Sequence, residues 1–473
     1  QAALERMWKA VLLNQFHDIL PGSSIAEVYE QTDKEYEAMI KECHALLKAL
    51  PLAQVKNAYT IYNSLGFTRE SVALLPITGT VTTADGTSLT TQVTHDNQLL
   101  VAVPEIAALD CVNLQVEETE VVPFEVENVE KVFETDDFHV VLNDNYEIIS
   151  LFDKACQREI IPQGEKLNEL IAYEDIPMDY DAWDIDVYYQ EKSWNINQVS
   201  EAKWVEKGPI RDTLKVVRPF ENSTITQFIH FNHGTRRVDF ETKVDWQLDQ
   251  VLLKAQMPIA VNTLEATYDI QFGNVTRNIH KNTTWDWARF ESCGQKWVDL
   301  SEGNYGVSVL SDSKYGFSTD FQKIGITLIK SAVDPYPKAD IGLHEFTYSI
   351  YAHEGTWKEG RTMEAGLDLN VPLLVLEGEL TTTTEAESFF SIDQANILLD
   401  TVKKAEDSNH VIVRLYEYMN SQSNATLTSQ LPVKKAVLCN MLEEEEQELV
   451  VEDNRIQVAF NPFEVQTVKV YFY

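Results

Sequence analysis

A histidine and an aspartate stand side by side near the start of the chain, at His17 and Asp18, between an apolar run and the turn residues Pro21 and Gly22. A neutral imidazole can bind zinc through a ring nitrogen, and an adjacent carboxylate can accept hydrogen bonds from a ligand. A structural interpretation also exists: His17 caps a helix end, where its charge suits the helix dipole, and Asp18 begins a turn. The residues alone leave both interpretations open.

Three further groups of residues combine carboxylates, aromatic rings or cations. The first is suited to holding a sugar, and its alternative is an exposed loop around a buried tryptophan. The second is predicted to fix a turn before an alternating strand at 346–351, and the third would either reach the rim of a neighbouring domain or anchor a loop. The first group is Tyr180, Asp181, Trp183, Asp184 and Asp186. The second is Asp340, His344 and Glu345, and the third is Arg277, Trp285, Asp286 and Arg289.

Composition excludes several classes of function. With 38 Lys and Arg against 75 Asp and Glu, the net charge is −37. A surface this acidic repels phosphate backbones and anionic lipid, so we expect no nucleic acid and no membrane as partner. The five cysteines are odd in number and lack a Cys-x-x-Cys pair, which favours a reducing cytoplasm over a disulfide framework. The local fingerprints of nucleotide-binding proteins, zinc proteases and serine hydrolases do not occur.

Two helices are predicted to position the histidine–aspartate pair. Apolar residues recur at three- and four-residue steps over 2–20, and a Pro-Gly pair then ends this helix. Ser24 and Glu27 form a capping-box pattern, so the second helix is expected to begin at about Ile25. The hairpin would leave an apolar stripe, and we expect its partner to lie upstream of Gln1.

The helical period disappears after about residue 55, and short alternating runs separated by turn residues follow, as is typical of antiparallel sandwiches. The sequence therefore predicts a mainly β fold: a helical hairpin followed by antiparallel β-sandwich domains, the central one a large double sheet. An acidic linker at Glu117–Glu130 and a Thr-rich stretch at Thr381–Glu387 are the expected boundaries, and the acidic run Glu443–Glu446 is expected to be a solvated loop. The predicted domains are a helical segment (1–53), a small sandwich (54–125), a large sandwich (126–385) and a C-terminal sandwich (386–473).

The segment Gln15–Ile25 resembles the signature of glycoside hydrolase family 38, the retaining α-mannosidases. Four later segments are similar to the bacterial and cytosolic branch of the family and follow in its order. They are Asn63–Gly66, Tyr180–Asp184, Lys314–Gly316 and Asp340–Tyr348. A small departure is Asn278, where relatives often carry proline. The resemblance runs along the whole chain but corresponds only to the carboxy-terminal half of a full enzyme, without its barrel-like catalytic domain.

The resemblance implies that His17 is a zinc ligand and that Asp18 contacts sugar hydroxyls. The other ligands of this single zinc ion, and the carboxylate nucleophile, would come from the N-terminal catalytic domain. The implied activity is that of a cytoplasmic, retaining exo-α-mannosidase acting on mannose-containing oligosaccharides, and we expect this chain to be inactive by itself. Asp181, Trp183 and Asp184 are further candidates for substrate contact, and self-association into a homo-oligomer stays open.

Two functions of other classes compete with this one. An aromatic-rich sandwich can serve as a non-catalytic carbohydrate-binding module, and a β scaffold can mediate oligomerisation. The first 25 residues distinguish them, because neither a binding module nor a scaffold has a use for a histidine–aspartate pair at a helix end that faces a missing domain.

Overall fold

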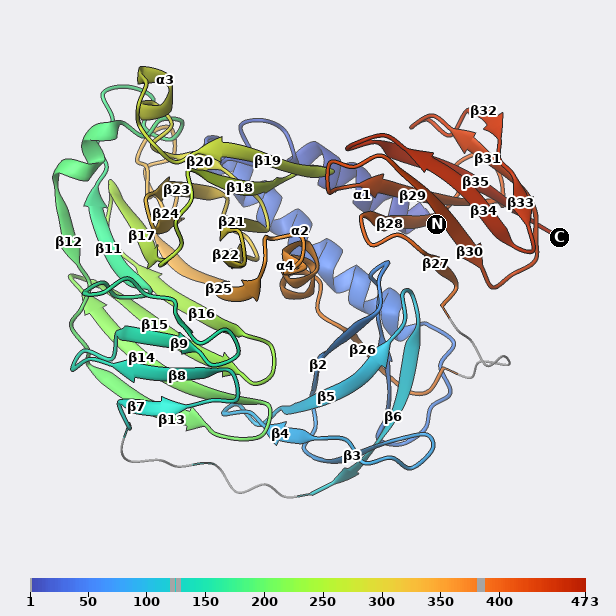
Figure 1. Cartoon of the computed structure of the whole chain (residues 1–473), viewed down its shortest axis with the longest axis horizontal. Helices are drawn as coiled ribbons and strands as arrows, with labels where there is room; N and C mark the ends of the chain where they lie inside the picture. Colours follow the sequence, from blue (N-terminus) through green and yellow to red (C-terminus); the bar gives the residue numbers. More distant parts are fainter. Residues whose placement is uncertain (1, 120–123, 125–128, 381–387) are drawn as a thin grey trace.

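The computed structural model describes residues 2–119, 124, 129–380 and 388–473. A helical hairpin is followed by antiparallel sheets that pack into three sandwiches (Figure 1). Among these described residues, strands hold 47% and helices 12%, which confirms the predicted mainly β class. The stretch Thr381–Glu387 and most of the linker at 117–130 lie outside the described residues. Among the helices described, none is long and apolar enough to cross a membrane.

Helix α1 spans Ala2–Asn14 and helix α2 spans Ala26–Lys48. The prediction that the first helix reaches residue 20 is therefore wrong. The buried Asn14 side chain bonds to α2, donating to Glu35 Oε2 (3.0 Å) and accepting from Thr32 (3.2 Å). The chain then reverses in tight turns. The Phe16 carbonyl accepts hydrogen bonds from the backbone amides of Ile19 (2.9 Å) and Leu20 (3.1 Å).

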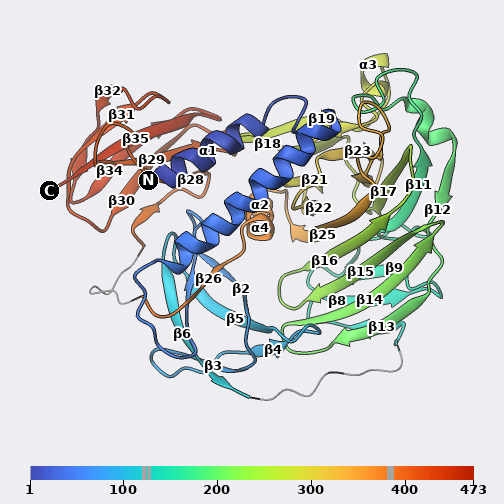
Figure 2. The same cartoon turned by 180° about the vertical axis from the view of Figure 1, so that it is seen from behind.

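The second helix begins where predicted, but the capping box is wrong. Its N-cap residue is Ile25, which makes no side-chain capping bond. The backbone amide of Ser24 donates instead to the hydroxyl of Tyr29 (3.0 Å), so a tyrosine one turn into the helix replaces the predicted serine–glutamate pair. Figure 2 shows α2 running from the loops of the large sandwich toward strand β26 (Leu374–Glu377).

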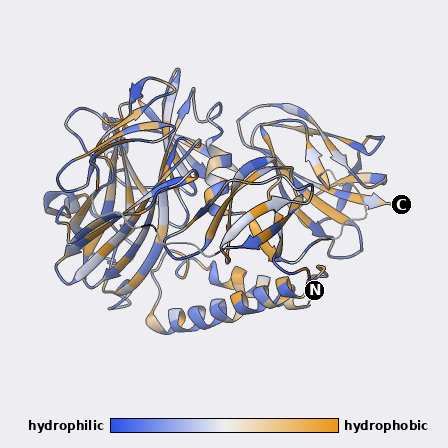
Figure 3. Ribbon diagram, turned by 90° about the horizontal axis from the view of Figure 1, so that it is seen from below, coloured by the Kyte–Doolittle hydropathy of each residue, from blue (hydrophilic) through white to orange (hydrophobic). Residues whose placement is uncertain are grey.

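The apolar stripe of the hairpin stays largely uncovered within the described chain. Helix α1 buries Met7 and Asn14, and α2 buries no residue completely. Figure 3 shows the two helices as a separate layer along one side of the sheets. Leu4, Trp8 and Leu12 are more than half exposed, so an apolar face of this size has room for a partner.

The small sandwich pairs a four-stranded sheet, in the order β26-β1-β6-β3, with a three-stranded sheet, β2-β5-β4. Their inner faces share one apolar core because alternate residues of each strand point inward. The strands are β1 Ala58–Tyr62, β2 Arg69–Leu75, β3 Gly79–Thr83, β4 Thr91–Val93, β5 Leu99–Ile106 and β6 Cys111–Glu118.

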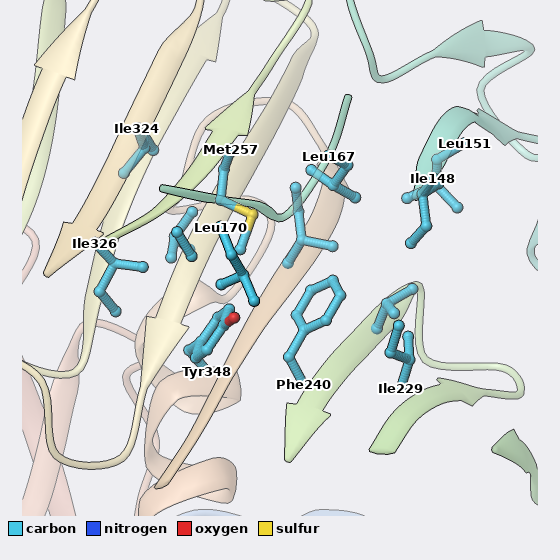
Figure 4. Close-up of a cluster of buried hydrophobic side chains, with 14 of the residues drawn as sticks. Ile148, Leu151, Leu167, Leu170, Ile229, Phe240, Met257, Ile324, Ile326 and Tyr348 are labelled. Atoms are coloured by element: carbon cyan, nitrogen blue, oxygen red, sulfur yellow. The ribbon is translucent and has the colours of Figure 1, made fainter. Parts of the chain in front are cut away.

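The large sandwich packs a nine-stranded sheet against a four-stranded and a six-stranded sheet around the largest core of the molecule. Figure 4 shows this core, in which Phe240 stacks on Tyr348 with ring centroids 5.3 Å apart, opposite Leu170 and Met257. The nine strands, in sheet order, are β13 Glu201–Glu206, β14 Arg211–Phe220, β15 Ser223–Asn232, β16 Arg237–Trp246, β25 Gly342–Glu354, β22 Tyr305–Ser311, β21 Trp297–Glu302, β18 Glu265–Ile270 and β19 Gly273–Asn278. The facing sheets contain β10 Arg158–Glu159, β9 Ile148–Asp153, β8 Phe138–Leu142 and β7 Val132–Glu134, and β12 Ser193–Asn195, β11 Glu169–Glu174, β17 Val251–Pro258, β24 Lys323–Ile329, β23 Gly316–Asp320 and β20 Ser292–Cys293.

Short helices and long loops follow the strand ends of the large sandwich. The 3-10 helix η1 (Val187–Glu191) follows the loop after β11, α3 (Thr284–Trp287) follows β19, and α4 (Thr362–Asn370) follows β25. Helix α4 joins a small apolar cluster with Trp297, Trp357 and Tyr416, which connects the large sandwich to the C-terminal one.

The C-terminal sandwich pairs a four-stranded with a five-stranded sheet around its own core. Its strands are β27 Phe390–Ile392, β30 Ser423–Ser429, β34 Arg455–Phe460 and β33 Val451–Glu452, and β28 Ile397–Lys404, β29 Val411–Glu417, β35 Val465–Phe472, β31 Val433–Cys439 and β32 Glu445–Glu448. The predicted solvated loop at 443–446 is wrong in part. Glu443 is buried and pairs with Lys403 at 2.8 Å, and β32 begins at Glu445, whereas Glu444 is exposed outside the strand.

Candidate functional site

The turn between α1 and α2 presents His17 and Asp18 to solvent. The His17 side chain is 78% exposed and that of Asp18 is 37% exposed, and His17 Nε2 lies 3.4 Å from Asp18 Oδ2. Helix α1 ends three residues before His17, and among the described contacts the ring bonds to no backbone carbonyl of that helix. The helix-capping interpretation is therefore wrong, and a ring nitrogen is left free to bind a ligand.

Asp18 is held in place through one carboxylate oxygen. Its Oδ1 accepts a hydrogen bond from the indole Nε1 of Trp183 (3.1 Å) and another from Ser23 Oγ (3.3 Å). Trp183 lies on the loop between β11 and η1, 165 positions further along the chain. Asp18 and Trp183, which the sequence marked separately, therefore meet in one place.

The acids around Trp183 fasten their loop. Asp181 Oδ2 accepts from the amide of Val333 (2.7 Å), and Asp186 Oδ2 accepts from the amide of Met178 (2.8 Å). Asp184 is exposed, and its backbone carbonyl accepts a hydrogen bond from a lysine on the neighbouring loop. The structure brings Trp183 to Asp18 and uses Asp181 to tie the loop down; the substrate contacts of Asp181, Trp183 and Asp184 stay predictions.

Tyr29 and Tyr336 support the turn, and sequence reasoning missed both. The Tyr29 hydroxyl donates to the Asp18 carbonyl (3.1 Å), and its ring stacks on Tyr336 with centroids 6.1 Å apart. Burial, followed by the nearby carboxylates of Asp340 and Asp18, raises the pKa of Tyr29, so the hydroxyl stays protonated and can donate. A tyrosine in the first turn of the second helix, eleven residues after Asp18, is the sequence signal that could have indicated this support.

The group Asp340, His344 and Glu345 fixes a turn, as predicted, through its first two members. Asp340 Oδ2 accepts from the amide of Ser331 (2.8 Å), and a ring nitrogen of His344 lies 2.7 Å from the Asp340 carbonyl oxygen. Glu345 belongs to strand β25, which begins at Gly342, four residues earlier than expected. It pairs across the sheet with Lys243 (3.3 Å).

The group around α3 is mainly an anchor. Asp286 accepts from the hydroxyl of Thr283 and from Arg289, both at 2.7 Å, which closes the short helix onto its own cap. The guanidinium of Arg277 lies 4.3 Å from the ring centroid of Tyr268. Trp285 differs from its neighbours because it is 82% exposed.

The donor set at the turn fits part of a zinc site. Zinc in a catalytic site takes three protein ligands and leaves a position open. Across the described ranges, no group of three or more His, Cys, Asp or Glu side chains could hold a metal ion. The exposed imidazole of His17 beside Asp18 is suited to contribute one ligand to such a set, and the rest of the set would have to come from other polypeptide.

Comparison with known proteins defines the class first. Three protein-family models match: "Alpha mannosidase middle domain" over residues 1–51, "Glycosyl hydrolases family 38 C-terminal domain" over 133–338, and "Glycosyl hydrolases family 38 C-terminal beta sandwich domain" over 396–468. The fold and these matches identify the middle and C-terminal regions of a glycosyl hydrolase.

Similar full-length proteins specify the family. Alpha-mannosidase 2C1 of Homo sapiens is 32% identical, and the match covers 98% of this chain and 45% of that protein. Alpha-mannosidase G of Dictyostelium discoideum is also 32% identical, and the match covers 98% of this chain and 48% of that protein. An alpha-mannosidase from Enterococcus faecalis V583 shares the fold, with a TM-score of 0.77 at 17% identity over 99% of this chain and 63% of that one. The chain belongs to glycosyl hydrolase family 38, and it spans about half the length of the curated relatives it matches.

Proposed function

We propose that this chain is the C-terminal part of a retaining, zinc-dependent exo-α-mannosidase that hydrolyses the α-mannosidic bonds of oligosaccharides. One observation carries the proposal: an exposed histidine–aspartate turn, His17 and Asp18, held by a loop of the large sandwich in a chain of family 38. The names of the relatives, which are alpha-mannosidases, support the substrate class.

His17 would hold the metal through a ring nitrogen of its exposed imidazole. The ion, when bound, would act as a Lewis acid and as a template for sugar hydroxyls. Asp18 would accept a hydrogen bond from a sugar hydroxyl through Oδ2, because its Oδ1 already receives two protein donors. The pair would thus orient a terminal mannose at the edge of this chain.

The chemistry of bond cleavage would come from a preceding catalytic domain. A retaining glycosidase uses a nucleophilic carboxylate and a carboxylic acid about 5 Å apart on the two sides of the scissile bond. We assign both to that domain, together with the remaining zinc ligands, and we place the domain over the exposed apolar face of α1 at Leu4, Trp8 and Leu12.

The cytoplasm is the proposed location of the enzyme. All five cysteines lie in described parts of the chain and are unpaired, which suits a reducing compartment. A homo-oligomer stays a prediction.

The test compares the 473-residue chain with the complete protein, meaning the chain expressed together with all of its natural upstream coding sequence. The complete protein is expected to hydrolyse an aryl α-mannoside with retention of configuration and to contain zinc, and the 473-residue chain is expected to do neither. Robust hydrolysis by the 473-residue chain would contradict the assignment of bond cleavage to a preceding catalytic domain. A complete protein that binds mannosides without cleaving them would favour the carbohydrate-binding module.

A further inference from the structure

The contact between Trp183 and Asp18 joins two parts of the molecule that the sequence keeps far apart. The indole Nε1 donates to Asp18 Oδ1 at 3.1 Å, and Ser23 Oγ reaches the same oxygen at 3.3 Å. An indole N–H can only donate, so Oδ1 of Asp18 is the acceptor in this bond. With Oδ1 occupied, the carboxylate is turned so that Oδ2 lies beside His17 Nε2, 3.4 Å away.

The loop that carries Trp183 is itself fixed at several points. The amides of Trp183 and Asp184 both donate to the Tyr180 carbonyl, at 2.8 and 2.9 Å. Tyr180 has a φ of +56°, a left-handed conformation that the surrounding bonds must hold. The loop is tied to the chain after β24 by the bond from the Val333 amide to Asp181 (2.7 Å).

The same chain segment after β24 also reaches the helical hairpin. Its residue Tyr336 stacks on Tyr29, whose hydroxyl donates to the Asp18 carbonyl at 3.1 Å. The backbone and the carboxylate of Asp18 are therefore both held by contacts that lead to the large sandwich. A side chain that must present one oxygen to a ligand gains precision from such support.

We propose that Trp183 is a positioning residue, which acts by orienting Asp18 and not as an aromatic platform for the sugar. This inference rests on the proposed function, because the oriented oxygen is the one assigned to the substrate hydroxyl. The indole ring is half exposed, at 50%, so its replacement removes the hydrogen bond without opening a cavity in a core. Trp183→Phe is the informative change, since it keeps an aromatic face and removes the N–H donor.

The first measurement needs neither metal nor substrate. In the 473-residue chain, the indole resonance of Trp183 is assigned in a ¹⁵N–¹H spectrum by its loss in Trp183→Phe. It is expected to move upfield and to exchange faster with water in Asp18→Ala, because the indole loses its acceptor. An indole resonance that is the same in the parent chain and in Asp18→Ala would overturn the contact and the proposal with it.

The second measurement is the split between KM and kcat in the complete protein. Trp183→Phe is expected to raise KM for a mannoside about three- to tenfold with unchanged zinc content, as for the loss of one hydrogen bond to a charged group. In an Asp18→Asn background, the same change is expected to add little, because the two residues act as a unit. Trp194→Phe, at another exposed tryptophan on β12, is the matched control and should leave KM unchanged.

Two outcomes of the second measurement would overturn the positioning role. One is a Trp183→Phe protein with the KM of the parent. The other is a double variant whose increase in KM equals the product of the increases in Trp183→Phe and Asp18→Asn. Unchanged KM in Trp183→Phe combined with a raised KM in Trp183→Ala would assign the platform role instead. A complete protein without α-mannosidase activity would overturn the proposed function, and the indole spectrum would still decide separately whether Trp183 holds Asp18.

Discussion

Two histidine–aspartate pairs in this chain have similar chemistry and opposite surroundings. His353 and Asp299 lie within the nine-stranded sheet, with Nε2 2.9 Å from Oδ2 and side chains 2% and 1% exposed. Ser308 adds a hydroxyl that donates to Asp299 at 2.8 Å. His17 and Asp18 are 3.4 Å apart on a turn, with side chains 78% and 37% exposed.

The comparison shows that residue type alone does not mark a site. The buried pair is closed off from solvent, so no ligand can reach it, and its polar contacts serve the stability of the sheet. The exposed pair has accessible atoms, and its carboxylate accepts one hydrogen bond from Trp183 of the large sandwich and one from Ser23 of its own turn. Exposure together with external support therefore separates a candidate site from a structural pair.

The largest expected effect is on catalysis at the exposed pair. His17→Ala in the complete protein should lower activity on an aryl α-mannoside by more than about a hundredfold, since the change removes the side chain proposed as a metal ligand. The free energy of unfolding should stay within about 0.5 kcal/mol, because the side chain packs against little. Steady-state kinetics measures the activity, and urea unfolding measures the stability. Near-parental activity in His17→Ala would contradict the functional role assigned to the exposed pair.

Asp18→Asn should have a smaller effect on activity, and it distinguishes the role of the carboxylate from that of the imidazole. The amide keeps the shape of the side chain but loses the charge proposed to bind a sugar hydroxyl, so we expect activity to fall about ten- to a hundredfold. Zinc content should be retained, because the carboxylate is assigned to the sugar. Parallel kinetics and metal analysis check this, and loss of zinc would make Asp18 a ligand or a support of the metal site.

The buried pair should respond in stability alone. His353→Ala removes the imidazole that pairs with Asp299 inside the sheet and leaves Ser308 as one of its remaining partners, so the free energy of unfolding should fall by about 2–4 kcal/mol. Zinc content and KM of the folded enzyme should stay unchanged. Denaturant unfolding measures the first quantity, and a loss of activity without loss of stability would run against the structural assignment.

The smallest expected effect concerns acid, at another buried network of the large sandwich. Burial of Glu206 favours its neutral form, but bonds from His95 and Arg211 outweigh burial and hold its pKa well below the usual range. A lowered folded pKa gives stability that is present above the unfolded value of about 4.3 and is lost as pH falls toward the folded value. The difference in unfolding free energy between parent and Glu206→Gln should therefore narrow as pH drops below about 4. A difference that stays constant down to acid pH would argue against this coupling.

The fold class could be predicted because alternation is a local property. The alternating strand predicted at 346–351 lies within β25, which spans Gly342–Glu354. Helix ends were harder, since Phe16 and Ile19 continue the apolar period while the side chain of Asn14 bonds to α2 and the chain turns away. Periodicity does not record such a tertiary bond.

The candidate site could be predicted only in pieces. His17 and Asp18 are adjacent in sequence, so the pair was visible without a structure. The bond from Trp183 to Asp18 depends on how two domains pack, and the stacking of Tyr29 on Tyr336 spans an even longer stretch of chain. Neither contact has a local pattern, and both require the folded sandwich.

The most direct test of the central claim is zinc stoichiometry in the complete protein and in two matched histidine variants. We expect about one zinc per chain in the parent and in those molecules of His353→Ala that fold, and almost none in His17→Ala. Zinc retained in His17→Ala at the level of the parent would contradict the claim that this exposed imidazole completes a metal site.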